Sequence, residues 1–213
     1  PESPSVNNPE NVSFYMFLQF LCYQQFQKVK IYASEKNILV KGDLPILISR
    51  DSADVWKHPH LFDLNFSAAA PPDAFAAQGQ NWGFPLYRWD VLESEGYRWW
   101  KERLKQANSF YHLYRIDHIV GFFRIWGIPL EKHATEGFFI PGDENIWIEH
   151  GNKIMKMMLE ACPMLPIGED LGTVPLEVRE ALRNMGICGT KVMRWERDWH
   201  GDRRFISGHE YIP

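Results

Sequence analysis

The sequence predicts an α/β fold built from parallel βα units. Four short runs of strand-forming residues stand out, namely ILV before Gly42, LYRIDHI around Asp117, LPI before Gly168 and TKVM after Gly189. Between them, hydrophobic residues recur at i, i+3, i+4 and i+7, the spacing of a helix with one buried face. Strands that alternate with helices form parallel βα units, so one α/β arrangement is expected.

Two of the expected helices lie near residues 154–161 and 178–185. Their hydrophobic positions are Ile154, Met157, Met158 and Ala161 in the first and Val178, Ala181, Leu182 and Met185 in the second. Thr173 and Pro175 precede the second helix and Gly186 follows it, as capping rules require. The longest hydrophobic run, Phe14 to Tyr23, is predicted to be a buried helix, because it is shorter than the roughly 20 residues that span a bilayer.

Four βα units predict part of a (β/α)8 TIM barrel with loop insertions. A complete barrel of eight units takes about 250 residues with its loops. A smaller doubly wound sheet is the alternative, but the GxGxxG phosphate loop that would support it does not occur. The stretch from Ser67 to Pro85 is predicted to be a long ordered loop. It falls in an insertion over residues 57–90 whose aromatic and glycine residues suit a binding surface.

Composition argues against several classes of function. The 213 residues are 45% hydrophobic and 23% charged, as in a globular domain, and the net charge of −4 without a basic cluster argues against nucleic-acid binding. Cys22, Cys162 and Cys188 lie outside any CxxC pattern, so no disulfide framework or zinc cluster is predicted. No signal peptide or membrane-spanning run is visible, so we expect a cytoplasmic protein without membrane partners.

Titratable residues interrupt the apolar run around Asp117. In a strand, the side chains of Arg115 and Asp117 point to the same face and His118 points to the other. An arginine beside an aspartate favours the ionised carboxylate, which prepares either a nucleophile or a structural ion pair. The two residues alone leave both interpretations open.

Further carboxylates follow other predicted strands. Glu169 and Asp170 come directly after LPI, at the carboxyl end of a strand, where parallel βα folds build their active sites. Asp170 is alternatively a helix cap, which would leave Glu169 for catalysis. Asp43 follows another strand, and Asp51 and Asp54 come soon after it; taken singly, each is an ordinary loop aspartate.

In a barrel, these carboxylates converge on one rim below the aromatic loop QNWGFPLYRW, and this combination suits a sugar. Two carboxyl groups that flank a glycosidic bond can break it, and an aromatic ring such as Trp82 can hold the apolar face of the sugar. A metal site made of Asp43, Asp117, His118 and Glu169 is the competing chemistry, but no HxH or HExxH spacing supports it. We therefore predict neither a metal nor a cofactor.

Five motifs, in order along the chain, resemble those of the 4-α-glucanotransferase family, also called the amylomaltase or disproportionating-enzyme family. They are GDLPI at Gly42, DSADVW at Asp51, GQNWGFPLYRWD at Gly79, YRIDHIVGFFRIW at Tyr114 and IGEDLGTVP at Ile167. The resemblance implies retaining transfer of α-1,4-glucan between maltooligosaccharides through a covalent glycosyl-enzyme.

The resemblance also implies a role for individual residues. Asp117 matches the nucleophile, Glu169 the acid/base and Arg115 the arginine that orients the nucleophile. The substrate-binding residues that it implies are Asp51, Gln80, Asn81, Trp82 and His118.

One departure from the family pattern concerns a third catalytic carboxylate, in a His-Asp pair after the next barrel strand. Neither this pair nor the first barrel strands have a counterpart in the chain. The resemblance therefore implies that residues 1–213 are the central part of one catalytic barrel, roughly its third to sixth βα units, and that this chain alone is nearly inactive. The alternative functions are an α-glucan hydrolase and a non-catalytic glucan-binding relative.

Overall fold

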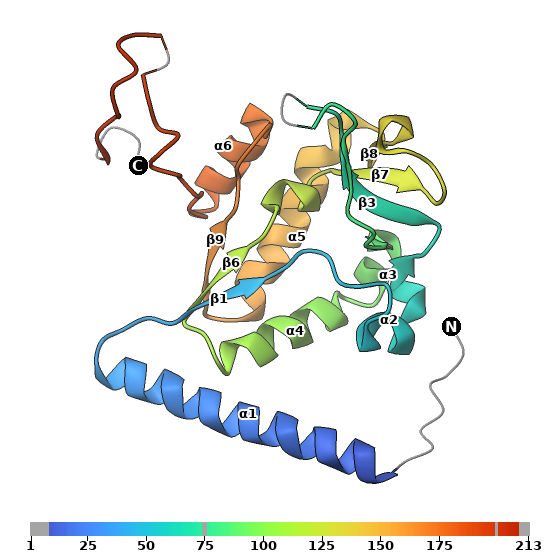
Figure 1. The fold of residues 1–213 in the computed structure, drawn as a ribbon, viewed down its shortest axis with the longest axis vertical. Helices are drawn as coiled ribbons and strands as arrows, with labels where there is room; N and C mark the ends of the chain where they lie inside the picture. The colour runs from blue at the N-terminus through green and yellow to red at the C-terminus, as the bar shows by residue number, and fades with distance from the viewer. Residues whose placement is uncertain (1–8, 74–75, 199, 209–213) are drawn as a thin grey trace.

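The computed structural model describes residues 9–73, 76–198 and 200–208 (Figure 1). The α-helices are α1 (Pro9–Glu35), α2 (Ala53–Lys57), α3 (Trp89–Ser94), α4 (Arg98–Asn108), α5 (Trp147–Ala161) and α6 (Leu176–Asn184). The 3₁₀ helices are η1 (Pro59–Leu61), η2 (Ile119–Phe122), η3 (Ala134–Glu136) and η4 (Glu144–Ile146). The strands are β1 (Lys41–Leu44), β2 (Phe62–Asp63), β3 (Phe66–Ala70), β4 (Gln80–Asn81), β5 (Leu86–Tyr87), β6 (Leu113–Ile116), β7 (Ile125–Pro129), β8 (Phe138–Ile140) and β9 (Leu165–Gly168).

A parallel sheet forms from β1, β6 and β9. The strands lie side by side in the same order in which they occur along the chain. The connections between them contain α4 and α5, so the prediction of parallel βα units is confirmed for these three strands. The first strand begins at Lys41, just after the predicted run ILV.

The prediction of a fourth strand at TKVM was wrong. Only Cys188 pairs with β9, through a single parallel bridge to Ile167. Thr190 directs its N–H to the side chain of Asp170 and its hydroxyl to the carbonyl of Gly168, so the N–H is not available to extend the ladder.

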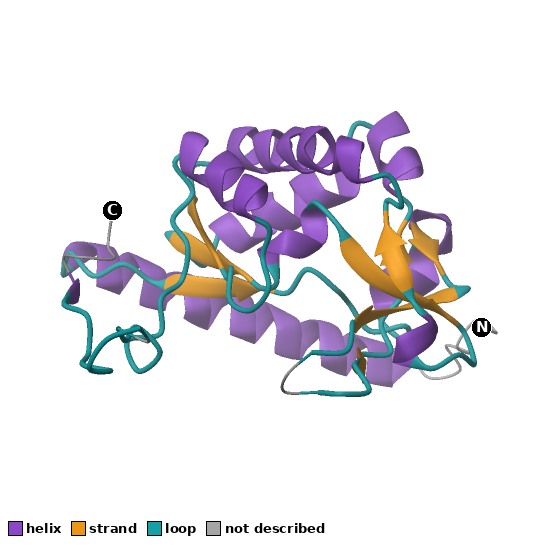
Figure 2. Ribbon diagram, turned by 90° about the horizontal axis from the view of Figure 1, so that it is seen from above, coloured by secondary structure: helices purple, strands orange, loops and turns teal. Residues whose placement is uncertain are grey.

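The two C-terminal helices are confirmed. Helix α5 buries Ile154, Met157 and Met158, and α6 buries Val178, Ala181 and Leu182. After α6, Gly186 has φ +71°, a left-handed conformation that glycine adopts at low cost. In Figures 1 and 2, α5 lies between the parallel sheet and the larger antiparallel sheet, so its hydrophobic face contributes to one core.

The antiparallel sheet has the order β4-β3-β7-β8, and a separate pair joins β2 to β5. The four-stranded sheet corrects the prediction of a loop from Ser67 to Pro85, because residues 66–70 form β3, one of its two inner strands. The small side chains of Ala68 and Ala69 are fully buried there. Alanine is depleted in strands, so the Ala-rich composition concealed a strand that its pairing with β7 stabilises.

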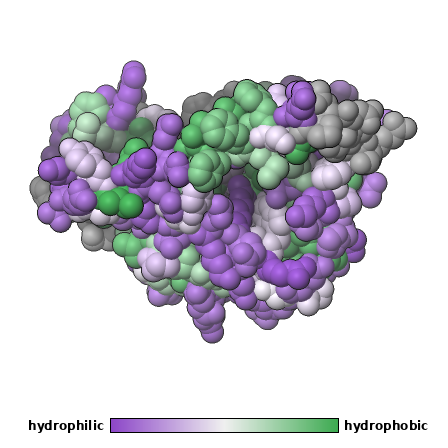
Figure 3. Space-filling view, turned by 90° about the horizontal axis from the view of Figure 1, so that it is seen from below, coloured by the Kyte–Doolittle hydropathy of each residue, from purple (hydrophilic) through white to green (hydrophobic). Residues whose placement is uncertain are grey.

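Helix α1 forms as predicted, but the prediction that it is buried was wrong. Every side chain from residue 10 to residue 20 is exposed, and within residues 10–35 Ala33 is the one buried side chain. Its hydrophobic residues are distributed around the helix instead of along one face. Its C-terminal half contacts the segment that follows α4, where the rings of Phe26 and Phe110 lie 5.5 Å apart. Figure 3 views the molecule from this side and shows hydrophobic side chains gathered beside a hollow lined by hydrophilic ones. Within the described residues, no helix is long and apolar enough to cross a membrane.

Candidate active site

The candidate catalytic carboxylates follow two neighbouring strands of the parallel sheet. Ile116 ends β6 and Gly168 ends β9, and these two residues are partners in the sheet register. The next residues are Asp117 and Glu169; the backbone N–H of Glu169 donates to the carbonyl of Ile116 at 2.8 Å. Neighbouring strands lie about 4.8 Å apart, so the two carboxylates start from adjacent backbone positions.

Arg115 links Asp117 to a second carboxylate. Its Nη2 contacts Asp117 Oδ1 at 2.6 Å and its Nη1 contacts Asp43 Oδ1 at 2.9 Å. Burial lowers the pKa of Arg115, but the hydrogen bonds and charges of Asp43 and Asp117 outweigh this effect and raise the pKa overall. Among the described residues, no hydrogen bond engages the other oxygen, Asp117 Oδ2. The predicted side-by-side arrangement of Arg115 and Asp117 is therefore observed, and Asp117 keeps one oxygen for another partner.

Glu169 is held against the backbone that carries Asp117. Its Oε2 accepts the N–H of His118 at 2.9 Å, and its Oε1 accepts the N–H of Leu171 at 2.9 Å. The first of these bonds comes from the peptide N–H between Asp117 and His118. The Glu169 carboxylate therefore lies beside the backbone that directly follows Asp117. The structure thus brings together the two residues that the sequence singled out from separate motifs.

His118 has a left-handed backbone, with φ +46°. This conformation is uncommon for a residue other than glycine, and non-glycine outliers of this kind cluster at functional sites. Burial is the main cause of the lowered pKa of His118, against which Glu169 and Asp117 act to raise it. Within the described ranges, no group of three or more His, Cys, Asp or Glu side chains could hold a metal ion.

The predicted binding loop reaches this site through Trp82. The Trp82 ring meets the His118 ring edge to face, with 5.0 Å between centroids, and its Nε1 donates to Gln80 Oε1 at 3.2 Å. Asn81 is exposed, and its Oδ1 accepts the hydroxyl of Ser67 at 2.7 Å. Asp51 is also exposed, but no hydrogen bond or ion pair among the described residues joins it to the two carboxylates.

Comparisons with known proteins show the family to which the chain belongs. A family model described as 4-alpha-glucanotransferase matches residues 2–213. The chain belongs to the 4-alpha-glucanotransferase family. It is 48% identical over 204 residues to a 4-alpha-glucanotransferase of Chlamydia pneumoniae, an alignment that covers 96% of this chain and 38% of the relative. The resemblance seen in the five motifs is confirmed.

Two solved amylomaltases have a similar fold. The amylomaltase of Corynebacterium glutamicum aligns with a TM-score of 0.81 at 29% identity and covers 100% of this chain and 30% of its own. The amylomaltase of Streptococcus agalactiae, solved in complex with acarbose, aligns with a TM-score of 0.74 at 31% identity and covers 86% of this chain and 38% of its own. The likeness implies a TIM-barrel-type fold. The chain spans about two fifths of the length of the curated relative.

Asp170, the other acid of this glucanotransferase motif, does not cap a helix, and that alternative was wrong. Helix α6 begins after Pro175 without a side-chain cap. Asp170 is instead buried, with 7% of its surface exposed, and forms an ion pair with Arg179. The sequence analysis did not predict that Arg179 and Thr190 contact Asp170. The signal present in the sequence was Asp170 followed nine residues later by Arg179, within an amphipathic helix.

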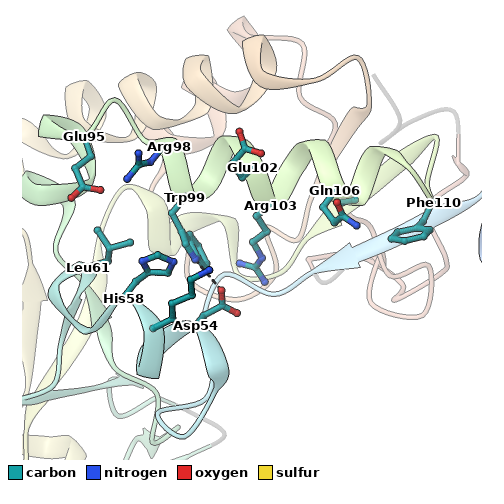
Figure 4. A pocket seen from close by; sticks show the side chains of 12 residues that line it. Asp54, His58, Leu61, Glu95, Arg98, Trp99, Glu102, Arg103, Gln106 and Phe110 are labelled. Carbon is teal, nitrogen blue, oxygen red and sulfur yellow. Dashed lines mark hydrogen bonds between the residues drawn. The ribbon is translucent and has the colours of Figure 1, made fainter. Parts of the chain in front are cut away.

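A large cavity, of about 520 Å³, lies away from these carboxylates (Figure 4). It lies between α4 and the α2–η1 segment, and its lining includes Trp99, whose Nε1 donates to Asp54 at 3.0 Å. None of the predicted site residues lines it. The candidate active site lies instead at the carboxyl ends of β6 and β9, where Asp117 and Glu169 follow the strands.

Proposed function

We propose that this chain carries the nucleophile and the acid/base of a retaining 4-α-glucanotransferase. The observation that supports this most directly is the placement of Asp117 and Glu169 at adjacent strand ends in a chain of this family. The proposed substrates are maltooligosaccharides and other α-1,4-glucans, and the acarbose complex of the Streptococcus agalactiae amylomaltase favours such a ligand. We propose no cofactor, no nucleic-acid or membrane partner, and a cytoplasmic location.

The proposed reaction has two displacements at one anomeric carbon. Asp117 attacks this carbon while Glu169 gives its proton to the leaving glycosidic oxygen, so the C–O bond breaks and a covalent glycosyl-enzyme forms. Glu169 then takes the proton of an incoming sugar hydroxyl, which attacks the same carbon and expels Asp117. Two inversions give net retention. Retaining enzymes keep these carboxyl groups about 5 to 5.5 Å apart, a separation that adjacent strands suit.

The other site residues support these two. Arg115 orients Asp117 and keeps a positive charge beside it, at 2.6 Å. Trp82 and His118 pack against each other at the strand ends and form part of the sugar-binding surface. The remaining proposed contacts to sugar come from Asp51 near the donor glucose and from Gln80 and Asn81 along the acceptor path.

We also propose that β1, β6 and β9 belong to a (β/α)8 barrel, as roughly its third to fifth strands, with the sixth position begun by the bridge at Cys188. Sequential order in the sheet favours a barrel over a doubly wound sheet, whose order reverses at a switch point. Residues 57–90 are an insertion over its rim. In this proposal, a third carboxylate comes from outside the 213 residues.

Product analysis with maltotriose tests the proposed function. We expect a protein of the relatives' length that contains this chain to produce glucose together with maltooligosaccharides longer than the substrate. We expect the 213-residue chain alone to be slower by several powers of ten, because removing one member of a catalytic unit commonly has that effect. Glucose and maltose without longer products would indicate a hydrolase. Binding without turnover by either protein would indicate a glucan-binding relative.

Replacing Trp82 by alanine tests the acceptor surface. Transfer requires a sugar to outcompete water for the glycosyl-enzyme, and an aromatic face favours the sugar by stacking on its C–H surface. We expect Trp82→Ala to lower the ratio of transfer to hydrolysis by about tenfold, the size of one stacking contact of about 1.5 kcal/mol. Chromatography of the products measures this ratio. Trp56→Ala, an exposed tryptophan on α2, is the control, and an equal ratio in both variants would exclude this role for Trp82.

A further inference from the structure

Asp170 connects three segments next to Glu169. Its Oδ2 forms an ion pair with Nη1 of Arg179 in α6, and its backbone carbonyl accepts Nη2 of the same arginine at 2.7 Å. Its Oδ1 accepts the N–H of Thr190 at 2.8 Å. One side chain therefore ties the end of β9 to α6 and to the segment that follows α6.

The same network holds the residue on the other side of Glu169. The hydroxyl of Thr190 donates to the carbonyl of Gly168 at 2.8 Å, and the N–H of Gly168 donates to the carbonyl of Cys188 at 2.7 Å. Gly189 makes this approach possible, since a Cβ there would lie 2.7 Å from Asp170 Oδ1. Both neighbours of Glu169 in the chain are thus fixed by hydrogen bonds to the segment 188–190.

Glu169 itself is fixed toward β6. Its N–H donates to the carbonyl of Ile116 at 2.8 Å, and its carbonyl accepts the N–H of Ile119 at 3.1 Å. The backbone around Glu169 is therefore held on one side by residues 116–119 and on the other side by residues 188–190. The Glu169 carboxylate accepts the N–H of the peptide between Asp117 and His118. Losing the network around Asp170 would release one of these two sides.

We propose that Asp170 and Arg179 are positioning residues for the acid/base. Their ion pair keeps the backbone of residues 168–170 in the one orientation that places the Glu169 carboxylate beside Asp117. This inference rests on the proposed function, because it requires Glu169 to transfer the proton. With 7% of its surface exposed, Asp170 is too buried to bind a glucan, so its contribution is to turnover and not to substrate affinity.

The test compares Asp170→Asn and Arg179→Met in the full-length protein. We expect each variant to lower kcat by about 10- to 100-fold with KM within about twofold of the original, because a displacement of about 1 Å at a reacting group has an effect of this size. The double variant should be no slower than the slower single variant, because the two residues act as one unit. Arg183→Met, an exposed arginine on the same helix, is the control and should leave kcat unchanged.

A second measurement separates positioning from proton transfer and from loss of fold. With an α-glucosyl fluoride donor, azide should restore turnover to Glu169→Ala but not to Asp170→Asn, where the acid/base is still present. Arg179→Lys should recover part of the kcat lost in Arg179→Met. The inference is wrong if Asp170→Asn keeps the original kcat, or if cooling the variant restores kcat fully, since that loss would come from unfolding. If Glu169→Gln also keeps the original kcat, the proposed function itself fails.

Discussion

Replacing Asp117 by asparagine is expected to slow glucan transfer by about 10⁴-fold or more, the effect of losing the nucleophile of a catalytic unit. The amide oxygen of asparagine can still accept the hydrogen bond from Arg115, but it carries no charge and attacks the anomeric carbon poorly. The Asp117 side chain is 42% exposed, and exposed ion pairs contribute only about 0 to 1 kcal/mol, so we expect little change in the free energy of unfolding. Transfer assays at saturating maltotriose, together with thermal unfolding, measure both effects.

Asp43→Asn is the matched control, because Asp43 binds the same arginine at 2.9 Å. Asp43 is the register partner of Arg115 and therefore lies further from the strand end than Asp117. If Asp117 only balanced the charge of Arg115, the two variants would lose similar activity. We expect Asp43→Asn to keep at least a hundred times more activity than Asp117→Asn. A slow fluorinated glucosyl donor should also leave a covalent sugar on the peptide that contains Asp117. Equal activity of the two variants, with no labelled peptide, would show that Asp117 forms only a structural ion pair with Arg115.

The parts of the site that could be predicted were those that depend on residues close together in the sequence. Arg115 lies in β6 and Asp117 directly follows its last residue, so the alternation of side chains predicts a shared face, and the ion pair at 2.6 Å agrees with this prediction. The pairing of Asp117 with Glu169 needed one further rule, that parallel strands end at the same edge of a sheet. Motif resemblance then predicted the family, which the comparisons confirm, and a chemistry that stays a prediction.

The parts that could not be predicted depend on partners distant in the sequence. Asp170 resembled a helix cap because a helix follows it, yet its partners are Arg179 within that helix and Thr190 beyond it. The TKVM run has strand-forming residues, but the N–H of Thr190 is used by a side chain and the ladder stops at Cys188. Hydrophobic content alone predicted burial for Phe14 to Tyr23, whereas burial also requires a surface that covers the side chains, and those of residues 10–20 are exposed.

Two hydrogen bonds make Glu169→Gln an informative variant. Each carboxylate oxygen accepts one backbone N–H, from His118 and from Leu171, both at 2.9 Å. A glutamine can satisfy only one of them, because its NH₂ group is itself a donor and would face the other N–H. We therefore expect a loss of about 1 kcal/mol in the free energy of unfolding, because one partly buried backbone N–H would lose its acceptor.

The effect of Glu169→Gln on catalysis should depend on the leaving group of the donor. A glucan leaves as a sugar alkoxide and needs a proton, so transfer from maltotriose should fall by about 10²- to 10⁴-fold, the usual contribution of general acid catalysis. Fluoride leaves without a proton, so the first step with an α-glucosyl fluoride should fall far less, and a burst of released fluoride should precede a slow second step that still lacks its general base. Rapid-mixing assays of fluoride release measure the two steps separately. An equal loss with both donors would mean that Glu169 does not transfer the proton and that its two hydrogen bonds serve only to shape the end of the strand.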